Sequence, residues 1–325
     1  MGMSRIVGTG SYAPERILTN AELAARIDTS DEWITSRTGI KERHLAAEGE
    51  QTSDMAVAAA RRALEMAGKQ PSDLDLIIVG TISGDMPMPS TATFVAHKLG
   101  IRVPAFDISA ACAGSVYGLS IADQFVKSGS KKCVLVVGVE LLSRLLDWED
   151  RNTCVLFGDA AGAMIIAPSD SDRGVLSTHL WADGSQTGIL NIPGGGSLHP
   201  ASHEVIDQRL HKVKMLGREV YKFAIRSLTD VVMEAVKANG LTVADIDHLV
   251  PHQANIRIVE QVMEKLGLPP EKAILNIHRF GNTSSASVPV TLDEGVRSGR
   301  IKQGDLVAMM AIGAGMTWGS ALVRW

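Results

Sequence analysis

Residues 107–119 read DISAACAGSVYGL, and this stretch decides how the rest of the chain is interpreted. It places Cys112 among alanine and glycine residues, where an apolar strand is expected to give way to a helix. The unpaired amides and the positive end of the helix dipole favour a thiolate at such a place, and small neighbours leave room for a substrate. The alternative is a small core residue, because free cysteine is among the most buried residue types. The other parts of the chain have to decide between these two interpretations.

Composition excludes several classes of protein. The chain has 325 residues, of which 45% are hydrophobic, so it can form a large core. Its 32 basic and 36 acidic residues give a net charge of −4, which argues against nucleic acid or an anionic membrane as partner. The sequence contains no CxxC pair, no basic leader and no apolar run long enough to span a membrane. We therefore expect a soluble cytoplasmic protein without a metal site or a disulfide framework, in which Cys133 and Cys154 are core residues.

Short apolar runs alternate with longer helical patterns along the chain. This succession is typical of an α/β fold whose central strands are mostly parallel. The clearest helical pattern covers residues 55–67, and the clearest apolar runs are residues 77–80, 134–139, 163–167 and 306–312.

Two pairs of similar segments indicate an internal repeat. AGKQPSDLDLIIVG (67–80) resembles NGLTVADIDHLVPH (239–252), at an offset of 239 − 67 = 172. VKSG (126–129) resembles VRSG (296–299), at an offset of 296 − 126 = 170. We interpret this pattern as an ancient duplication that produced two similar α/β halves.

The repeat predicts the domain boundary and brings three reactive residue types together. The N-terminal half is expected at residues 1–170 and the C-terminal half at 171–325, joined by a stretch with the composition of a linker. The offset of 170 pairs Cys112 with Asn282, and His252 follows a predicted strand of the second half. Sites in open α/β sheets gather at the carboxyl ends of strands, so all three side chains could face one cleft. Taken singly, His252 could be structural and Asn282 a helix cap.

A cysteine, a histidine and an asparagine from distant positions suggest nucleophilic acyl chemistry. In such chemistry a thiolate attacks a carbonyl carbon, and fixed hydrogen-bond donors hold the oxygen that becomes negative. A glycine-rich turn in AIGAGMTWGSAL (311–322) could bring a further backbone amide to the same oxygen.

Five segments, taken in order, closely resemble β-ketoacyl-[acyl-carrier-protein] synthase III, the initiating condensing enzyme of bacterial type II fatty acid synthesis. The resemblance implies the thiolase fold, in which two duplicated α/β halves form a layered αβαβα arrangement, and it implies a homodimer. The segments are DTSDEWITSRTGIKERH (28–44), DISAACAGSVYGL (107–119), LVPHQANIRI (249–258), HRFGNTSSASVPV (278–290) and GAGMTWGSAL (313–322).

The resemblance also implies a reaction: decarboxylative Claisen condensation of an acyl-CoA primer with malonyl-acyl carrier protein. The primer would be acetyl-CoA or a short or branched acyl-CoA, and the products would be β-ketoacyl-carrier protein, CoA and CO₂. Cys112 would carry the primer, His252 and Asn282 would bind the extender's thioester carbonyl, and the amides of Cys112 and Ala314 would form the oxyanion hole. No cofactor is implied, because the CoA and phosphopantetheine thioesters are substrates.

The same resemblance assigns the binding surfaces. Trp33 and Arg37 would sandwich the adenine of CoA, and Met88 of one subunit would close the acyl pocket of the other. Met88 and Ile312 stand where the family often has phenylalanine, which suggests a pocket that admits chains longer than acetyl. The remaining CoA contacts would be Arg151, Gly217, Tyr221, Ala254 and Asn255.

A basic stripe is expected on one helix face. Lys214, Arg218, Lys222 and Arg226 recur every fourth residue within residues 211–226. A merely solvated face is the alternative. Since the carrier protein is expected to be acidic, we predict that Lys214, Arg218 and Lys222, together with Arg257, form its docking patch.

Other functions of the same fold remain open. A ketosynthase or acyltransferase of secondary metabolism would share the acyl-Cys112 and differ in its acceptor. Thiolases need a second active-site cysteine, which the turn at 313–315 lacks, and hydroxymethylglutaryl-CoA synthases need an acidic base that the sequence does not place. Chalcone-type synthases share the three residues but not the surrounding motifs. A non-catalytic acyl-CoA-binding module is disfavoured because Cys112, His252 and Asn282 are all retained.

Overall fold

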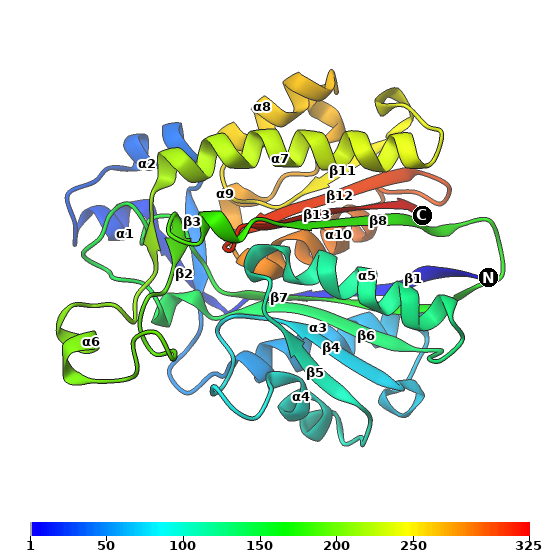
Figure 1. The fold of residues 1–325 in the computed structure, drawn as a ribbon, viewed down its shortest axis with the longest axis horizontal. Helices are drawn as coiled ribbons and strands as arrows, with labels where there is room; N and C mark the ends of the chain where they lie inside the picture. The colour runs from blue at the N-terminus through cyan, green and yellow to red at the C-terminus, as the bar shows by residue number, and fades with distance from the viewer. Residues whose placement is uncertain (1) are drawn as a thin grey trace.

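Two stacked β-sheets form the centre of the molecule in a computed structural model of the chain, which describes residues 2–325 (Figure 1). The first sheet has the strand order β1-β7-β6-β4-β5, and the second has the order β11-β12-β13-β8. The strands of the first sheet are β1 (Met3–Tyr12), β7 (Ala160–Ser169), β6 (Val134–Glu140), β4 (Leu76–Gly80) and β5 (Ala105–Ile108). Those of the second are β11 (His248–Pro251), β12 (Leu306–Gly313), β13 (Thr317–Arg324) and β8 (Gly174–Ala182).

Helices fill the space between the two sheets and cover both outer faces. The inner layer consists of α5 (Gly114–Lys127) and α10 (Ser287–Arg297), which contact strands of both sheets. The outer helices are α3 (Thr52–Ala67) and α4 (Thr91–Leu99) on the first sheet, and α7 (Gly217–Ala238) and α8 (Ile256–Leu266) on the second. Figure 1 shows these five layers one above the other, so the αβαβα arrangement expected from the sequence is confirmed.

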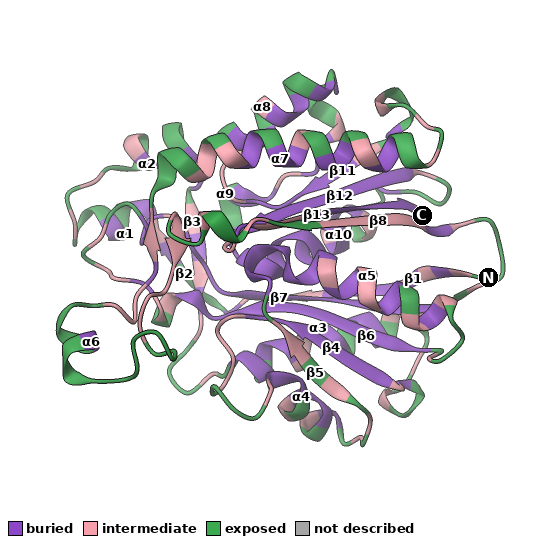
Figure 2. Ribbon diagram, in the orientation of Figure 1, coloured by how far each residue is buried: buried purple, intermediate pink, exposed green. Residues whose placement is uncertain are grey.

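Burial explains why the central strands are uniformly apolar. Every residue of β4 and β6 is buried, because helices cover both faces of the sheet (Figure 2). The hydrophobic side chains of α5 pack between the sheets, where Leu119 and Ala122 are fully buried. The inner layer therefore fixes the position of the segment that leads into α5, and that segment contains Cys112.

The internal repeat appears as matched local structure. Gly68 (φ 63°) ends α3, and Gly240 (φ 66°) follows α7 in the same left-handed conformation, which glycine adopts without steric cost. Short 3₁₀ turns follow at Pro71–Asp73 and at Val243–Asp245, and then β4 and β11 begin at positions 76 and 248. These starts differ by 248 − 76 = 172, which is the offset of the sequence match.

One expectation about strand direction needs correction. The segment 163–167 lies in β7, which runs antiparallel to both of its neighbours, and β13 likewise runs antiparallel to β12 and β8. The turn between β12 and β13 has only three residues, and a crossover to a parallel strand needs a dozen or more. Each sheet is therefore mixed, and parallel pairing is confined to β4 with its two neighbours and to β11 with β12.

The remaining helices and strands are β2 (Arg16–Thr19), α1 (Asn20–Ala24), α2 (Asp31–Thr38), β3 (Glu42–Leu45), β9 (Leu190–Asn191), α6 (His203–Asp207), β10 (Lys214–Met215) and α9 (Ile277–Phe280). Among them, α1, α2, α6, β2 and β3 lie at one end of the molecule, on the left of Figure 1. No helix within residues 2–325 is long and apolar enough to cross a membrane.

Candidate active site

Cys112 lies in a short 3₁₀ turn, Ala111–Ala113, directly before the inner helix α5. The matching turn of the second half is Ser284–Ala286, directly before α10. Ala111 (φ 44°) and Ser284 (φ 49°) share an unusual left-handed backbone conformation at the start of the two turns. The equivalent of Cys112 is therefore Ser285, and the predicted equivalence of Cys112 with Asn282 is wrong by three residues.

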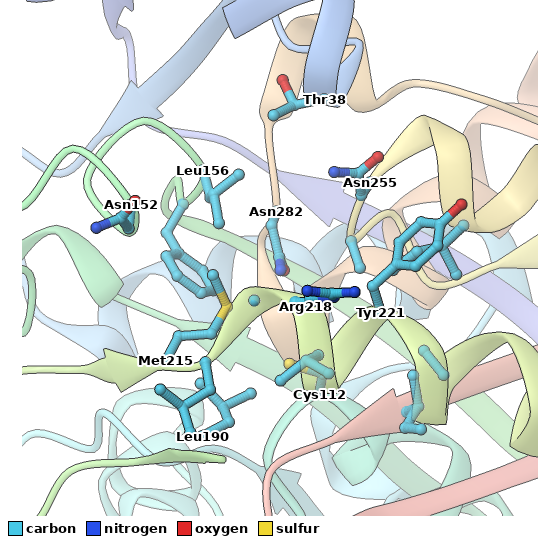
Figure 3. A pocket seen from close by; sticks show the side chains of 18 of the residues that line it. Thr38, Cys112, Asn152, Leu156, Leu190, Met215, Arg218, Tyr221, Asn255 and Asn282 are labelled. Carbon is cyan, nitrogen blue, oxygen red and sulfur yellow. The ribbon is translucent and has the colours of Figure 1, made fainter.

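Two cavities meet at Cys112, each of about 720 Å³. The first is lined by Cys112, His252 and Asn282 together, so the structure brings the three predicted residues to one cavity. Figure 3 shows Cys112 and Asn282 in this cavity. The second also reaches Cys112 and shares Phe157 and Leu190 with the first. Its apolar lining comes from Ile82, Pro87, Leu142, Leu145, Phe157, Leu190, Ile192 and Val213.

Opposing effects of the surroundings set the pKa of the Cys112 thiol. Only 6% of the residue is exposed, and this burial is the largest influence on the thiol, raising its pKa to about 12. A hydrogen bond with the Ser284 side chain lowers the pKa, while the charge of Glu140 raises it. The helix end favours the thiolate as the sequence suggested, but burial opposes it, so the thiol needs further help to lose its proton.

His252 is a neutral hydrogen-bond donor. It follows β11, and its amide donates to the carbonyl of Met310 on β12 (2.7 Å). The Ser287 hydroxyl lies 2.8 Å from Nδ1 and accepts a hydrogen bond from the Gln253 amide, and its own proton has no other acceptor among residues 2–325. We therefore assign the tautomer in which Ser287 donates to Nδ1 and the second ring nitrogen, Nε2, carries the proton. Burial lowers the pKa of His252 to about 3, which keeps the ring uncharged at neutral pH.

The buried ring of His252 should make stability depend on pH. Burial lowers its pKa from 6.5 to about 3, so between these values only the unfolded chain binds the proton. The free energy of unfolding is therefore unaffected by protonation of His252 above pH 6.5, and it falls by about 1.4 kcal/mol per pH unit as the pH decreases toward 3. We expect urea unfolding of His252→Gln to show a shallower loss of stability over this range than the unsubstituted chain. Equal slopes would contradict a neutral buried histidine.

Hydrogen bonds fix Asn282 and leave its side-chain nitrogen Nδ2 without an acceptor among residues 2–325. Its backbone is held between the carbonyl of Leu156 (2.8 Å) and the amide of Gly158 (3.0 Å). Its side-chain oxygen Oδ1 accepts a hydrogen bond from the Ser284 amide (2.8 Å). Because Oδ1 is occupied, Nδ2 is the group that remains to donate a hydrogen bond into the cavity.

The glycine turn lies against the nucleophile. A Cβ atom on Gly313 would meet the Cys112 amide nitrogen at 2.4 Å, so only glycine fits there. The Thr317 hydroxyl donates to the carbonyls of Ala110 (2.8 Å) and Ala314 (3.1 Å), which ties the turn to the Cys112 segment. The Ala314 amide donates to no acceptor among residues 2–325, and Ala314 lines the second cavity beside Cys112. Two amides, of Cys112 and Ala314, are thus available for a developing oxyanion.

The residues predicted to bind CoA all line the first cavity. The Arg37 guanidinium lies 4.7 Å from the centre of the Trp33 ring, and that of Arg151 lies 5.5 Å from it. A base stacked on Trp33 would need the space that Arg37 occupies, so this arginine must move aside for such a ligand. The full set found in the lining is Trp33, Arg37, Arg151, Gly217, Tyr221, Ala254 and Asn255.

The predicted basic stripe is shorter than expected. Helix α7 begins at Gly217, so Lys214 lies in strand β10 and is not part of the helix face. Arg218 is exposed but lines the first cavity, as Figure 3 shows, and Arg226 lies 3.8 Å from Asp230. Lys222 is exposed and lies 3.4 Å from Glu219.

The two residues assigned to the acyl pocket lie apart. Ile312 is buried and lines the first cavity. Met88 is 83% exposed and lines neither of the two cavities at Cys112, although its neighbour Pro87 lines the second. Met88 therefore does not close the acyl pocket of its own chain. Cys133 and Cys154 are buried core residues, as predicted.

Four residues of the site were not singled out from the sequence. Ser284 and Ser287 contact the predicted residues, and both belong to the run NTSSAS, whose density of hydroxyl groups is the signal. Gln253 holds the segment after His252 by hydrogen bonds to the backbone around residue 276. Glu140 ends an otherwise apolar strand, and an acidic residue at that place was a usable signal.

The two matched halves and the cysteine, histidine and asparagine at their cavity define a condensing enzyme of the thiolase fold, an acyltransferase. The family profile for 3-oxoacyl-[acyl-carrier-protein (ACP)] synthase III matches residues 106–184, and the profile for its C-terminal part matches residues 236–325. Proteins named beta-ketoacyl-[acyl-carrier-protein] synthase III from Paramagnetospirillum magneticum and Caldanaerobacter subterraneus are 53% and 51% identical to the chain. These matches cover 98–99% of the chain and 97–98% of the relatives. The chain belongs to the β-ketoacyl-[acyl-carrier-protein] synthase III family.

Solved structures of the family have the same fold. The crystal structure of 3-oxoacyl-[acyl-carrier-protein] synthase III from Aquifex aeolicus is 46% identical, with a TM-score of 0.93, over 99% of the chain and 100% of that structure. The priming β-ketosynthase of the R1128 polyketide pathway is 38% identical, with a TM-score of 0.92, over 99% of the chain and 96% of that structure.

Proposed function

We propose that this condensing enzyme joins an acyl-CoA primer to malonyl-acyl carrier protein, with loss of CO₂, through an acyl-Cys112 intermediate, and so initiates fatty acid synthesis. The observation that carries the proposal is the position of Cys112, where a cavity containing His252, Asn282 and the CoA-binding candidates meets a second, apolar cavity. The first cavity would hold the pantetheine arm, and the second would hold the acyl chain of the primer.

The donors account for the decarboxylation. As CO₂ leaves the malonyl group, negative charge moves to the thioester carbonyl oxygen. The Nε2–H group of His252 and the Nδ2–H group of Asn282 are fixed by their neighbours and can bind that oxygen without reorganisation. The resulting carbanion attacks the acyl-Cys112 carbonyl, whose oxygen is bound by the amides of Cys112 and Ala314. No carboxylate base is required, because loss of CO₂ forms the carbanion directly.

We further propose a homodimer in which Met88 closes the acyl pocket of the partner subunit. The support is the exposure of three large apolar side chains, Phe106 on the edge strand β5 and Met86 and Met88 in the segment between β4 and α4. Replacing Met88 with alanine should raise kcat/KM for hexanoyl-CoA several-fold relative to acetyl-CoA, because it would enlarge the pocket. Met86→Ala, which changes a neighbouring exposed methionine, serves as the matched control. An unchanged ratio for Met88→Ala, or a monomeric mass by light scattering, would contradict this proposal.

The carrier protein is proposed to dock at Lys222 and Arg257, beside the mouth of the first cavity. Arg257 is exposed at the start of α8, and its guanidinium donates to the carbonyl of Ser36 (2.7 and 3.1 Å), which holds it next to α2. Lys214 and Arg218 complete the proposed patch, although Arg218 also faces the cavity.

Charge reversal tests this docking patch. The double substitution Lys222→Glu and Arg257→Glu should raise KM for malonyl-carrier protein roughly tenfold, because an acidic partner would be repelled, while KM for acyl-CoA changes far less. Lys237→Glu on the same helix α7 is the matched control and should leave both constants unchanged. Equal increases for the two substrates would exclude a carrier-specific patch.

A second candidate is a priming ketosynthase of secondary metabolism. The observation that favours it is the similarity to the R1128 priming β-ketosynthase. That similarity, at 38% identity, is weaker than the similarity of 51–53% to the relatives named beta-ketoacyl-[acyl-carrier-protein] synthase III. Comparing fatty acid and polyketide carrier proteins as acceptors distinguishes the two candidates. A preference of at least tenfold for the polyketide carrier protein would favour the second.

A further inference from the structure

Glu140 is a fully buried carboxylate to which the condensation mechanism assigns no role. It ends β6 with an exposure of 0%, and it takes part in no ion pair among residues 2–325. A buried carboxylate without a cation is costly unless several hydrogen bonds hold it. Its Oε2 atom accepts hydrogen bonds from the Thr81 hydroxyl (3.2 Å), the Ile82 amide (3.1 Å) and the Ser83 hydroxyl (2.5 Å).

The other carboxylate oxygen of Glu140 points toward the nucleophile. Oε1 accepts a hydrogen bond from the Ser284 hydroxyl at 3.1 Å. The Ser284 hydroxyl also faces the Cys112 thiol, and both residues line the second cavity. A hydroxyl group has one proton. When Ser284 donates that proton to Glu140, its Oγ atom can only accept a hydrogen bond from the Cys112 thiol. With a neutral thiol, the chain of donors therefore runs from Cys112 S–H to Ser284 O–H to Glu140. The same hydroxyl turned toward the sulfur would donate to a thiolate, and that contact is the one that lowers the pKa of the thiol.

His252 is not a candidate to receive the thiol proton. No hydrogen bond among residues 2–325 joins its ring to the thiol, and in the tautomer assigned above Nε2 already carries a proton. Glu140 is therefore the acceptor that hydrogen bonds connect to Cys112.

We propose that Glu140, acting through Ser284, accepts the proton of the Cys112 thiol while Cys112 attacks the primer thioester. This inference rests on the proposed acylation of Cys112. As the new bond between Sγ and the carbonyl carbon forms, the S–H bond breaks, its proton moves to Ser284 Oγ, and the Ser284 proton moves to Glu140 Oε1. When the C–S bond to CoA breaks, the proton returns along the same chain and forms the S–H bond of CoA.

This relay removes the difficulty of a buried thiolate. Before the transfer Glu140 carries one negative charge, and after it the charge lies on the carbonyl oxygen of the primer, so the net charge at the site stays constant. A free thiolate beside an ionised Glu140 would instead add a second buried negative charge. Burial raises the pKa of Glu140 to about 7, which makes the carboxylate a stronger base than an exposed one.

The environment of Glu140 contains few other titratable groups. The segment 81–83 and the turn at Ser284 contribute only hydroxyl groups and an amide to it, and the paired residue on β7 is Ala160. Cys112 is the titratable group on the turn Ala111–Ala113, and its pKa responds to the charge of Glu140. The pH dependence of acylation should therefore report on this pair.

The test is the single-turnover rate of Cys112 acylation by acetyl-CoA between pH 6 and 9, followed by mass spectrometry. In the unsubstituted chain the rate should become independent of pH above about 7, where Glu140 is ionised. In Glu140→Gln the plateau should disappear, and the rate should rise about tenfold per pH unit as thiolate forms. At pH 7 the variant should be slower by about 10²- to 10⁴-fold.

Ser284→Ala provides a second variant, which keeps the carboxylate but interrupts the chain. Alanine is compatible with the backbone at this position, because Ala111 adopts φ 44° at the equivalent place. It too should lose the plateau. Thr81→Val removes one hydrogen bond to Glu140 Oε2 and leaves Ser284 and Oε1 in place. It should keep a plateau, with its onset moved to higher pH, because the lost hydrogen bond lowers the pKa of Glu140.

The outcomes separate the relay from the proposed function. If the unsubstituted chain is not acylated at all, the proposed function fails. If it is acylated, and Glu140→Gln or Ser284→Ala keeps the plateau above pH 7, the relay is wrong. Once acylated by long incubation at high pH, both variants should still be discharged by malonyl-carrier protein within a few-fold of the normal rate. A matching loss in that second step would indicate general damage to the site and would also overturn the relay.

Discussion

Replacing Cys112 with alanine should abolish acylation by acyl-CoA and reduce condensation by roughly 10⁵- to 10⁶-fold, because the variant has no nucleophile to carry the primer. The cavities and the donors His252 and Asn282 do not depend on the thiol, so the variant should still bind CoA. Binding can be measured by calorimetry, and acylation by intact-protein mass spectrometry.

The two remaining cysteines provide the control for this result. Cys133 and Cys154 are buried and line neither of the two cavities that meet at Cys112. Cys133→Ala should therefore accept an acetyl group at the normal rate. If the Cys112→Ala variant is acylated at another residue and still forms the condensation product, Cys112 is not the nucleophile.

Replacing His252 or Asn282 with alanine should leave acylation of Cys112 intact and slow the release of CO₂ from malonyl-carrier protein by about 10²- to 10³-fold for each donor. The reason is that both groups bind the carbonyl oxygen that becomes negative during decarboxylation, whereas neither is needed for the attack of Cys112. The measurements are the mass of the acyl-enzyme and the rate of CO₂ release.

Ser287→Ala distinguishes a positioned donor from a merely polar one. The Ser287 hydroxyl fixes the His252 ring with Nε2 protonated, so its loss should slow decarboxylation by a smaller factor than the loss of the ring. If His252→Ala or Asn282→Ala fails to form acyl-Cys112 but still releases CO₂ from malonyl-carrier protein, the roles assigned to the two half-reactions are reversed.

The sequence predicted the architecture because its signals are local. Apolar runs such as residues 77–80 and 134–139 became strands buried on both faces, and the segments 67–80 and 239–252 became matching units of glycine, 3₁₀ turn and strand. Strand direction was less accessible, since the reversal of β7 depends on how its ends are connected and not on its composition.

The site was only partly predictable, and the errors have physical causes. The offset of 170 came from helix ends, but α10 is three residues shorter than α5, so the helix starts differ by 287 − 114 = 173. That difference moved the predicted partner of Cys112 from Ser285 to Asn282. Periodicity alone also could not show that α7 begins after Lys214.

Contacts between residues far apart in the chain could not be predicted from the sequence. Glu140 and Ser284 are 144 residues apart, and no local pattern places them in contact. The pKa of Cys112 likewise depends on burial among elements from both halves, so the helix end alone gave an incomplete account of the thiol.

The central claim is that Cys112 carries the primer and that the second half of the chain activates the extender. Intact-protein and peptide mass spectrometry after incubation with acetyl-CoA, followed by addition of malonyl-carrier protein, tests it most directly. The account predicts one acetyl group on Cys112, which malonyl-carrier protein removes with release of CO₂ and formation of acetoacetyl-carrier protein. The absence of an adduct, or an adduct on Cys112 that malonyl-carrier protein does not discharge, would contradict it.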